Sequence, residues 1–120
     1  MGLDFSHTEA HWTYTGFMRF RRAIATHEGI DLDQMNGFRI YGSNQPQIPW
    51  TAVTTALRPL LDHSDCDGEL SPEECRLVAP RLREVVSAVW PKDCYDRTHG
   101  LLLADGMEAA AAAGEQFEFC

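Results

Sequence analysis

The sequence predicts a small, mainly α-helical domain, from its composition, its apolar periodicity and the residues that end its periodic segments. Of 120 residues, 44% are hydrophobic and 10% are aromatic, which is ordinary for a globular chain. Apolar residues recur at helical spacing in several segments, and glycine or proline follows three of them, as at helix ends. The length fits a single domain over residues 1–120, with no internal repeat or linker.

Two helical elements are predicted near the N-terminus. Residues 6–9, Ser-His-Thr-Glu, have the form of a capping box and predict a short helical turn. A helix over about residues 15–28 places Phe17, Phe20 and Ile24 on one face and stops at a glycine. Three arginines of this helix are expected off that face, at the solvated surface: Arg19, Arg21 and Arg22.

The next segment, residues 31–49, is predicted to contain little regular structure. Asp31 is placed to cap one turn that contains Leu32 and Met35. Residues 38–49 have no helical period and predict a long loop, with a short strand over Phe38–Tyr41 as an alternative for its first part.

A helix-loop-helix is predicted over about residues 50–90. The incoming helix covers about residues 50–61. Its inward-facing residues are expected to be apolar: Val53, Leu57 and either Leu60 or Leu61. The outgoing helix starts at Pro72. Pro80 is expected to kink or divide it, because proline removes a backbone donor and clashes with the preceding turn at a cost of about 3 kcal/mol.

A last helix is predicted over about residues 93–113, ending at Gly114. Its apolar face is expected to contain four residues: His99, Leu103, Met107 and Ala110. Residues 3–5 and 117–119 both alternate between apolar and acidic side chains. They predict a minor two-stranded pairing that joins the termini.

The most informative stretch is residues 63–74, HSDCDGELSPEE. Calcium takes six to eight hard oxygen ligands, and a tight glycine turn lets alternate side chains of a loop point inward. The calcium-loop pattern D-x-[DN]-x-[DN]-G-x5-E is matched after its first position, which holds His63. Residues 62–74 contain six acids and no base, a crowding that repels itself unless a positive charge lies there.

This stretch resembles the loop of the EF-hand family, and the resemblance covers only the loop and its flanks. It implies a helix-loop-helix that holds one Ca²⁺. The third, fifth, seventh, ninth and twelfth positions, the seventh through its main-chain carbonyl, would be Asp65, Asp67, Glu69, Ser71 and Glu74. The first ligand would be either His63, whose nitrogen suits a hard cation poorly, or Asp62 one residue earlier.

Members of this family usually carry their loops in pairs, and this chain has one such loop. The resemblance therefore implies one of two arrangements. Either the rest of the domain braces the loop and calcium is structural, or two chains pair their loops in a homodimer. We favour structural calcium, because a sensor needs a helix pair that switches cleanly.

Other interpretations of the same residues stay open. Residues 71–74, Ser-Pro-Glu-Glu, are also a capping box with proline at the first helical position. An Asp- and Gly-rich run is also typical of a solvated turn without metal. A zinc site with three cysteines and one histidine would use His63, Cys66, Cys75 and Cys94, but it lacks the close cysteine pair of such sites.

A second metal site is a further hypothesis. His7 and His11 are four residues apart, so they share a face if this segment is helical. Such a pair suits zinc or nickel, with Asp4 or Glu9 as a further ligand. The order H-T-E-A-H differs from the H-E-x-x-H of metalloproteases, and packing or hydrogen bonding is the more usual role. A metal-dependent hydrolase built on these histidines has the least support, so the sequence favours a non-catalytic protein.

The charge balance limits the partners. A net charge of −8 argues against nucleic acid and anionic membrane as main partners and suits a cation or a basic protein. No apolar run reaches the ~18 residues that span a bilayer. The first residues lack the basic flank and apolar core of a signal peptide. We therefore expect a cytoplasmic protein with reduced cysteines.

An alternative function is that of a protein-interaction module or an inhibitor. The whole chain also resembles small bacterial or phage proteins whose activity is not established. On this hypothesis the loop of residues 38–49 and three aromatic residues would contact the partner: Tyr41, Trp50 and Trp90. Core packing is the more usual role of such aromatic residues.

Overall fold

The computed structural model describes residues 2–35, 48–63 and 68–120 and confirms a mainly α-helical fold. Its α-helices are α1 (Tyr14–His27), α2 (Arg58–Leu61), α3 (Pro72–Val89) and α4 (Tyr95–Ala113). Two 3₁₀ turns cover Leu32–Gln34 and Trp50–Ala52. Two antiparallel pairs join β1 (Gly2–Leu3) to β2 (Trp12–Thr13) and β3 (Gly68–Leu70) to β4 (Phe117–Phe119).

Helix α1 begins and ends where its sequence predicts. The Thr13 hydroxyl accepts a hydrogen bond from the Gly16 N–H at 3.0 Å and caps the helix. Gly29 follows the helix with φ +78°, a conformation that glycine adopts without steric cost. Phe17, Phe20 and Ile24 are fully buried on the predicted face. The turn after the helix is also as predicted, since the Asp31 carboxylate accepts from the Asp33 N–H.

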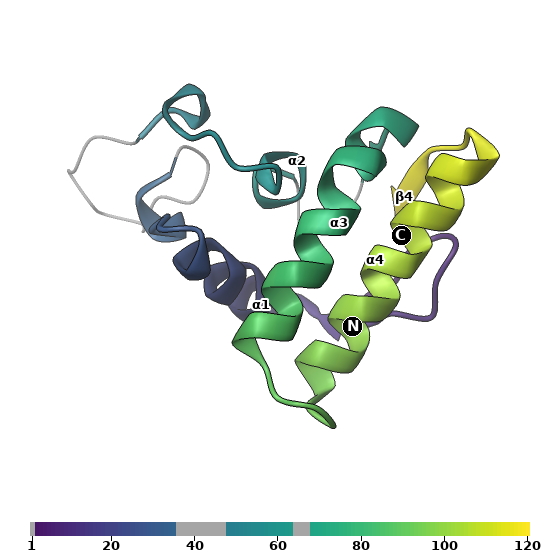
Figure 1. Cartoon of the computed structure of the whole chain (residues 1–120), viewed down its shortest axis with the longest axis horizontal. Coiled ribbons are helices and arrows are strands. Elements are labelled where there is room, and N and C mark those ends of the chain that lie inside the picture. The colour runs from purple at the N-terminus through teal and green to yellow at the C-terminus, as the bar shows by residue number, and fades with distance from the viewer. Residues whose placement is uncertain (1, 36–47, 64–67) are drawn as a thin grey trace.

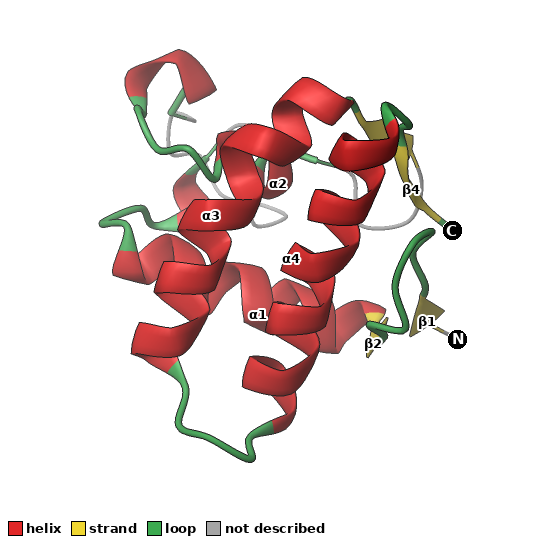
Figure 2. Ribbon diagram, turned by 45° about the vertical axis from the view of Figure 1, so that its right-hand side comes forward, coloured by secondary structure: helices red, strands yellow, loops and turns green. Residues whose placement is uncertain are grey.

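Helices α3 and α4 form an antiparallel hairpin, against which α1 packs (Figure 1; Figure 2). The expected division of the outgoing helix at Pro80 is wrong, because α3 runs without interruption from Pro72 to Val89. Pro80 lies on the exposed side of the helix. Proline has no backbone N–H, so the helix lacks one hydrogen bond at this position. Neighbouring turns bury Val78 and Leu82, and this packing holds the helix through the proline.

The predicted incoming helix over residues 50–61 is mostly absent. A 3₁₀ turn and an extended stretch come first, and α2 itself has only four residues. The Thr55 hydroxyl accepts from the Leu57 N–H at 3.1 Å, a local bond that competes with helix formation. Pro59 lies in the first turn of α2, where its missing N–H costs little. Of the predicted inward residues, Leu57 and both Leu60 and Leu61 are fully buried, and Val53 is partly buried against the core.

The termini meet, although less simply than predicted. A β-bridge joins Phe5 to Phe119, and the Cys120 N–H donates to the Asp4 carbonyl at 2.8 Å. The main partner of β4 is β3, with Gly68, Glu69 and Leu70 opposite Phe119, Glu118 and Phe117. The C-terminal strand is therefore paired directly with residues 68–70 of the acidic loop, and the N-terminal residues contact that strand.

The predicted helical turn at residues 6–9 is wrong, because these residues form a non-helical turn. His7 has φ +65°, which a helix excludes. The Ser6 side chain accepts from the Glu118 N–H at 2.9 Å, so it serves the strand contact and does not cap a helix. None of the helices in the described ranges is both long and apolar enough to cross a lipid bilayer.

Candidate cation site at the acidic loop

The structure describes both ends of the predicted calcium loop. On the entry side, α2 ends at Leu61 and is followed by exposed Asp62 and by His63. On the exit side, β3 leads directly into α3. Two predicted ligands, Asp65 and Asp67, lie outside the described residues, as does Cys66 of the zinc hypothesis.

Ser71 and Glu74 form the predicted capping box of α3. The Glu74 N–H donates to Ser71 Oγ at 3.1 Å, and the Ser71 N–H donates to Glu74 Oε1 at 2.9 Å. This geometry satisfies two N–H groups that the first helical turn leaves without partners. Glu74 therefore has a structural role, with its second carboxylate oxygen outside the capping box.

His63 closes the loop through its ring. Its Nε2 donates to the Glu69 carbonyl oxygen at 3.2 Å, which joins the first loop position to the seventh. The ring stacks on Phe119 with the centroids 3.9 Å apart, and Gly68 has no Cβ to obstruct it. Gly68 has φ +105°, so the sixth position makes the turn that requires glycine.

Strand β4 braces the exit side of the loop. Leu70 is 1% exposed and Phe117 is fully buried, so the side chains of this strand pair reach the core. Glu69 and Glu118 lie directly opposite each other on the exposed face. Two carboxylates at such a cross-strand position repel each other. Glu118 thus adds negative charge beside the loop from a residue far away in the sequence.

Arg21 contradicts the expectation that all three arginines of α1 lie at the surface. It is 1% exposed, and its guanidinium lies over the Phe17 ring at 5.0 Å. Its Nη1 approaches the carbonyl oxygens of Leu60 and Leu61 at 3.5 Å each and donates to the His63 carbonyl. Sequence spacing contained a signal for this position, since residue 21 is four residues after Phe17 and on the same helix face.

No group of three or more histidine, cysteine or acidic side chains is placed to hold a metal among the described residues. For the zinc hypothesis, burial and then the neighbouring Glu74 raise the pKa of the Cys75 thiol to about 11. A thiol with a raised pKa gives up its proton less readily to a metal. Cys75, Cys94 and Cys120 are free thiols.

His7 and His11 contact different carboxylates. His7 Nε2 lies 3.0 Å from Glu115 Oε1, and His11 Nδ1 lies 2.8 Å from Asp4 Oδ1. The segment between them is not helical, so the shared helix face of the sequence analysis does not form. The pair with Glu115 joins the N-terminal segment to the residues after α4, and the pair with Asp4 lies within the N-terminal segment itself.

His99 anchors the same segment in a way that depends on its protonation. Its Nδ1 accepts from the His11 N–H at 3.0 Å, and its ring stacks on Tyr95 at 4.0 Å. Burial, followed by the nearby His11, lowers the pKa of His99, and Asp96 opposes this shift. An imidazolium has no acceptor nitrogen, so protonation breaks the bond from His11.

We expect this bond to make the stability of the protein depend on pH. The pKa of His99 is lower in the folded state than in the unfolded state. The hydrogen bond to neutral His99 therefore contributes its full stabilisation above the unfolded pKa of ~6.5, and this stabilisation is lost as pH falls through the folded-state pKa. The loss should be on the order of 1 kcal/mol, the usual value of one hydrogen bond. Urea unfolding at pH 8 and at pH 5 measures it, and His99→Gln, which does not titrate, should reduce the difference. An equal pH dependence in this variant would contradict the role of His99.

The three aromatic residues of the interaction hypothesis lie in different environments. Trp50 is 6% exposed and belongs to the core, as the usual role of such residues predicts. Trp90 is half-buried and stacks on Phe20 with the centroids 5.1 Å apart and the rings 6° from parallel. Tyr41 lies outside the described residues, with most of the loop of residues 38–49.

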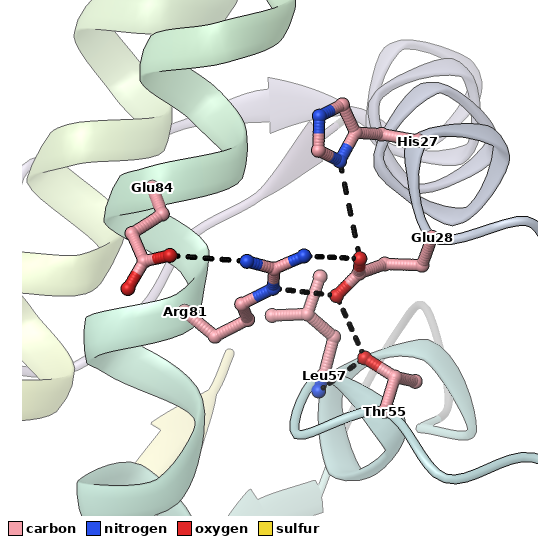
Figure 3. Close-up of polar contacts among 6 residues, drawn as sticks. All are labelled: His27, Glu28, Thr55, Leu57, Arg81 and Glu84. Atoms are coloured by element: carbon pink, nitrogen blue, oxygen red, sulfur yellow. Dashed lines mark hydrogen bonds and ion pairs between the residues drawn. The ribbon is translucent and has the colours of Figure 1, made fainter.

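An ion pair between buried Glu28 and half-exposed Arg81 fixes the segment that enters the loop (Figure 3). Arg81 of α3 donates to both carboxylate oxygens of Glu28, at 2.8 Å and 2.7 Å. Thr55 donates to the same carboxylate at 2.9 Å. Three segments, the end of α1, α3 and the stretch before α2, therefore meet at one side chain.

Comparison of the chain with family models, with curated proteins and with solved structures gives no match. The geometry of the loop and its neighbours is therefore what bears on the function of this chain.

Proposed function

We propose that this protein is a non-catalytic calcium-binding protein in which one EF-hand-like loop, over residues 62–74, holds a structural Ca²⁺. The main support is the strand pair that follows the glycine of the loop. In the EF-hand family a second loop usually braces the first, and here β4 pairs with β3 on the exit side. The domain itself thus supplies a brace, and the proposal needs no homodimer.

The donor chemistry of the loop fits calcium. Carboxylate, carbonyl and hydroxyl oxygens are the ligands that Ca²⁺ prefers. In the described part of the loop these are Asp62, Glu69, Ser71 and Glu74. The contact between His63 and the Glu69 carbonyl brings the two sides of the loop together without a metal. Because the His63 ring is a nitrogen donor packed on Phe119, Asp62 is the better candidate for the first ligand.

The packing favours a structural ion over a signalling one. Calcium sensors change the angle between two helices around the loop and expose an apolar groove. Here α2 has only four residues, and its Leu60 and Leu61 are fully buried. On the other side α3 packs along α4. We expect calcium to raise the melting temperature without opening the helices.

Replacing Glu74 with glutamine tests the ligand assignment. Glutamine still accepts the Ser71 N–H, so the capping box is kept while the negative charge of the twelfth position is lost. We expect Glu74→Gln to weaken Ca²⁺ binding at least about tenfold, since ligand charge tunes affinity. Isothermal titration of chelator-treated protein with Ca²⁺, Mg²⁺ and Zn²⁺ gives the affinities.

Glu73→Gln is the matched control. Glu73 lies in the same first turn of α3, and its side chain is 79% exposed and 3.8 Å from Arg76. Its substitution removes the same charge from the same helix end, so binding should change by less than about threefold. Equal effects of the two variants would mean that the loop attracts cations only through its general charge. Absence of calcium binding in the unmodified protein would refute the proposal.

A further inference from the structure

We propose that Ser6 is a nucleophilic serine, activated by His7 and Glu115, that takes up an acyl group from an activated ester. The site lies where the N-terminal segment meets the residues after α4, and it shares no residue with the acidic loop. Acyl transfer here needs no calcium and goes beyond the proposed function. A single transfer to the protein also needs no turnover, so it is compatible with a non-catalytic role.

Three side chains form a continuous hydrogen-bonded chain. Ser6 Oγ lies 2.6 Å from His7 Nδ1, and His7 Nε2 lies 3.0 Å from Glu115 Oε1. A carboxylate only accepts, so neutral His7 carries its proton on Nε2 and its Nδ1 is an acceptor. The Ser6 hydroxyl therefore donates to His7. This is the order of nucleophile, base and orienting carboxylate that activates a serine for acyl transfer.

The main chain holds both ends of this hydrogen-bonded chain in place. The Ser6 N–H donates to the Glu118 carbonyl at 2.9 Å, and the Glu118 N–H donates to Ser6 Oγ at 2.9 Å. Glu115 follows the end of α4, where its N–H donates to the Ala110 carbonyl at 2.9 Å and Gly114 has φ +69°. The nucleophile and the carboxylate are thus positioned before a substrate arrives, which lowers the entropic cost of the reaction.

His7 has a main-chain conformation that residues with a side chain rarely adopt. Its φ is +65°, and such conformations cost free energy and concentrate at functional sites. The His7 side chain is 22% exposed, and its ring lies 6.3 Å from that of Phe117, centroid to centroid. Neither Ser6 nor His7 is fully buried, so a small ester can reach both.

The main chain beside Ser6 also has a donor for the negative oxygen that forms during acyl transfer. In one large class of serine hydrolases the N–H of the residue after the nucleophile serves this purpose. Here that residue is His7. Its N–H makes no hydrogen bond to residues 2–35, 48–63 or 68–120, the ranges that the structure describes. This N–H is therefore free to donate to a substrate carbonyl oxygen.

Acylation of Ser6 uses the proton of its own hydroxyl. Ser6 Oγ attacks the carbonyl carbon of the ester, a bond forms between these atoms, and the hydroxyl proton moves to His7 Nδ1. Negative charge collects on the carbonyl oxygen. When the carbonyl forms again, the bond to the alcohol oxygen breaks, and this oxygen takes the proton from His7. The products are O-acyl-Ser6 and an alcohol, and no oxidant, reductant or further reactant takes part.

Reaction of the full chain with p-nitrophenyl acetate tests the site. The protein is treated with chelator, the reaction is quenched with acid, and tandem mass spectrometry measures the rate of acetylation at each serine. We expect His7→Asn to lower the rate at Ser6 about 100-fold, the usual contribution of a general base. Asparagine tolerates a positive φ but cannot take up the proton.

Glu115→Gln tests the positioning role of the carboxylate. We expect it to lower the rate of Ser6 acetylation about tenfold, because glutamine can turn its amide toward the ring and favour the wrong tautomer. The Glu115 side chain is 62% exposed, so the melting temperature should stay within about 2 °C of the parent value. A purely structural role would leave the rate at Ser6 unchanged.

Ser87 is the matched internal control. It is an exposed serine of α3, and no histidine among the described residues contacts its hydroxyl. Ser6 should react at least about 100-fold faster than Ser87 in the same sample. Equal rates at the two serines overturn the inference, as does an unchanged rate at Ser6 in folded His7→Asn. If His7→Asn does not fold, an unchanged rate in Glu115→Gln overturns it. None of these results depends on whether the protein binds calcium.

Discussion

Replacing Phe117 with alanine should lower the free energy of unfolding by about 3–5 kcal/mol, the usual cost of removing a buried aromatic ring. Phe117 is fully buried where β4 packs on α4. Its ring is stacked on Phe5 with the centroids 5.6 Å apart, and it fills the space that a side chain at Gly106 would occupy. The neighbours cannot close this space without moving a strand or a helix. Urea unfolding followed by circular dichroism measures the change.

The same substitution tests whether the pairing of β4 with β3 supports the loop. If β4 holds β3 in place, Phe117→Ala should also weaken calcium binding, although no predicted ligand is altered. Glu118→Ala is the control, because Glu118 lies on the exposed face of the same strand and its loss should cost less than about 0.5 kcal/mol. A loss of stability below about 1 kcal/mol for Phe117→Ala would mean that β4 contributes little to the core.

We expect the second large effect from Glu28→Gln, at about 2 kcal/mol of unfolding free energy. The Glu28 side chain is only 8% exposed, and its two oxygens accept from Arg81 and Thr55 (Figure 3). Glutamine has one acceptor oxygen, and its amide group would face the arginine donors. The Arg81 side chain is 37% exposed, so water compensates part of this loss.

The ion pair also has a pH signature. The hydrogen bond from Arg81, opposed in part by burial, lowers the pKa of Glu28. Its stabilisation is therefore full above the ordinary carboxyl pKa of about 4.3 and is lost as pH falls through the lower folded value. Glu84→Gln is the matched control, since Glu84 binds the same arginine at 3.0 Å but is 67% exposed. If the two variants lower the free energy of unfolding equally in urea at pH 7, burial of Glu28 does not strengthen its ion pair with Arg81.

The long helices were predictable because their signals are local. Thr13 and Ser71 cap helices through bonds that span three residues, and Gly29 and Gly114 follow helices with positive φ. The break at Pro80 was not predictable in the same way, because packing against α4 outweighs the lost hydrogen bond. The predicted incoming helix does not form over most of its length, and Thr55 is a local cause. Its hydroxyl accepts from the Leu57 N–H and so favours a turn before α2.

The candidate site was predictable only in part, for a similar reason. The order of acids, glycine and capping box from Asp62 to Glu74 is local, and it predicted the turn at Gly68 and the start of α3. The contact of His63 with Phe119 and the pairing of β3 with β4 depend on residues about 50 positions apart. Arg21 is buried although its charge predicts exposure, and its spacing from Phe17 places it on the buried face of α1.

The pairing of β3 with β4 has a consequence for biosynthesis. Translation produces β3 first, and both long helices must follow before the residues of β4 exist. A ribosome-bound intermediate therefore displays an unpaired strand beside a crowded group of carboxylates, a state open to misassembly. A cation bound at that stage would reduce the repulsion among these carboxylates before β4 is available to pair with β3.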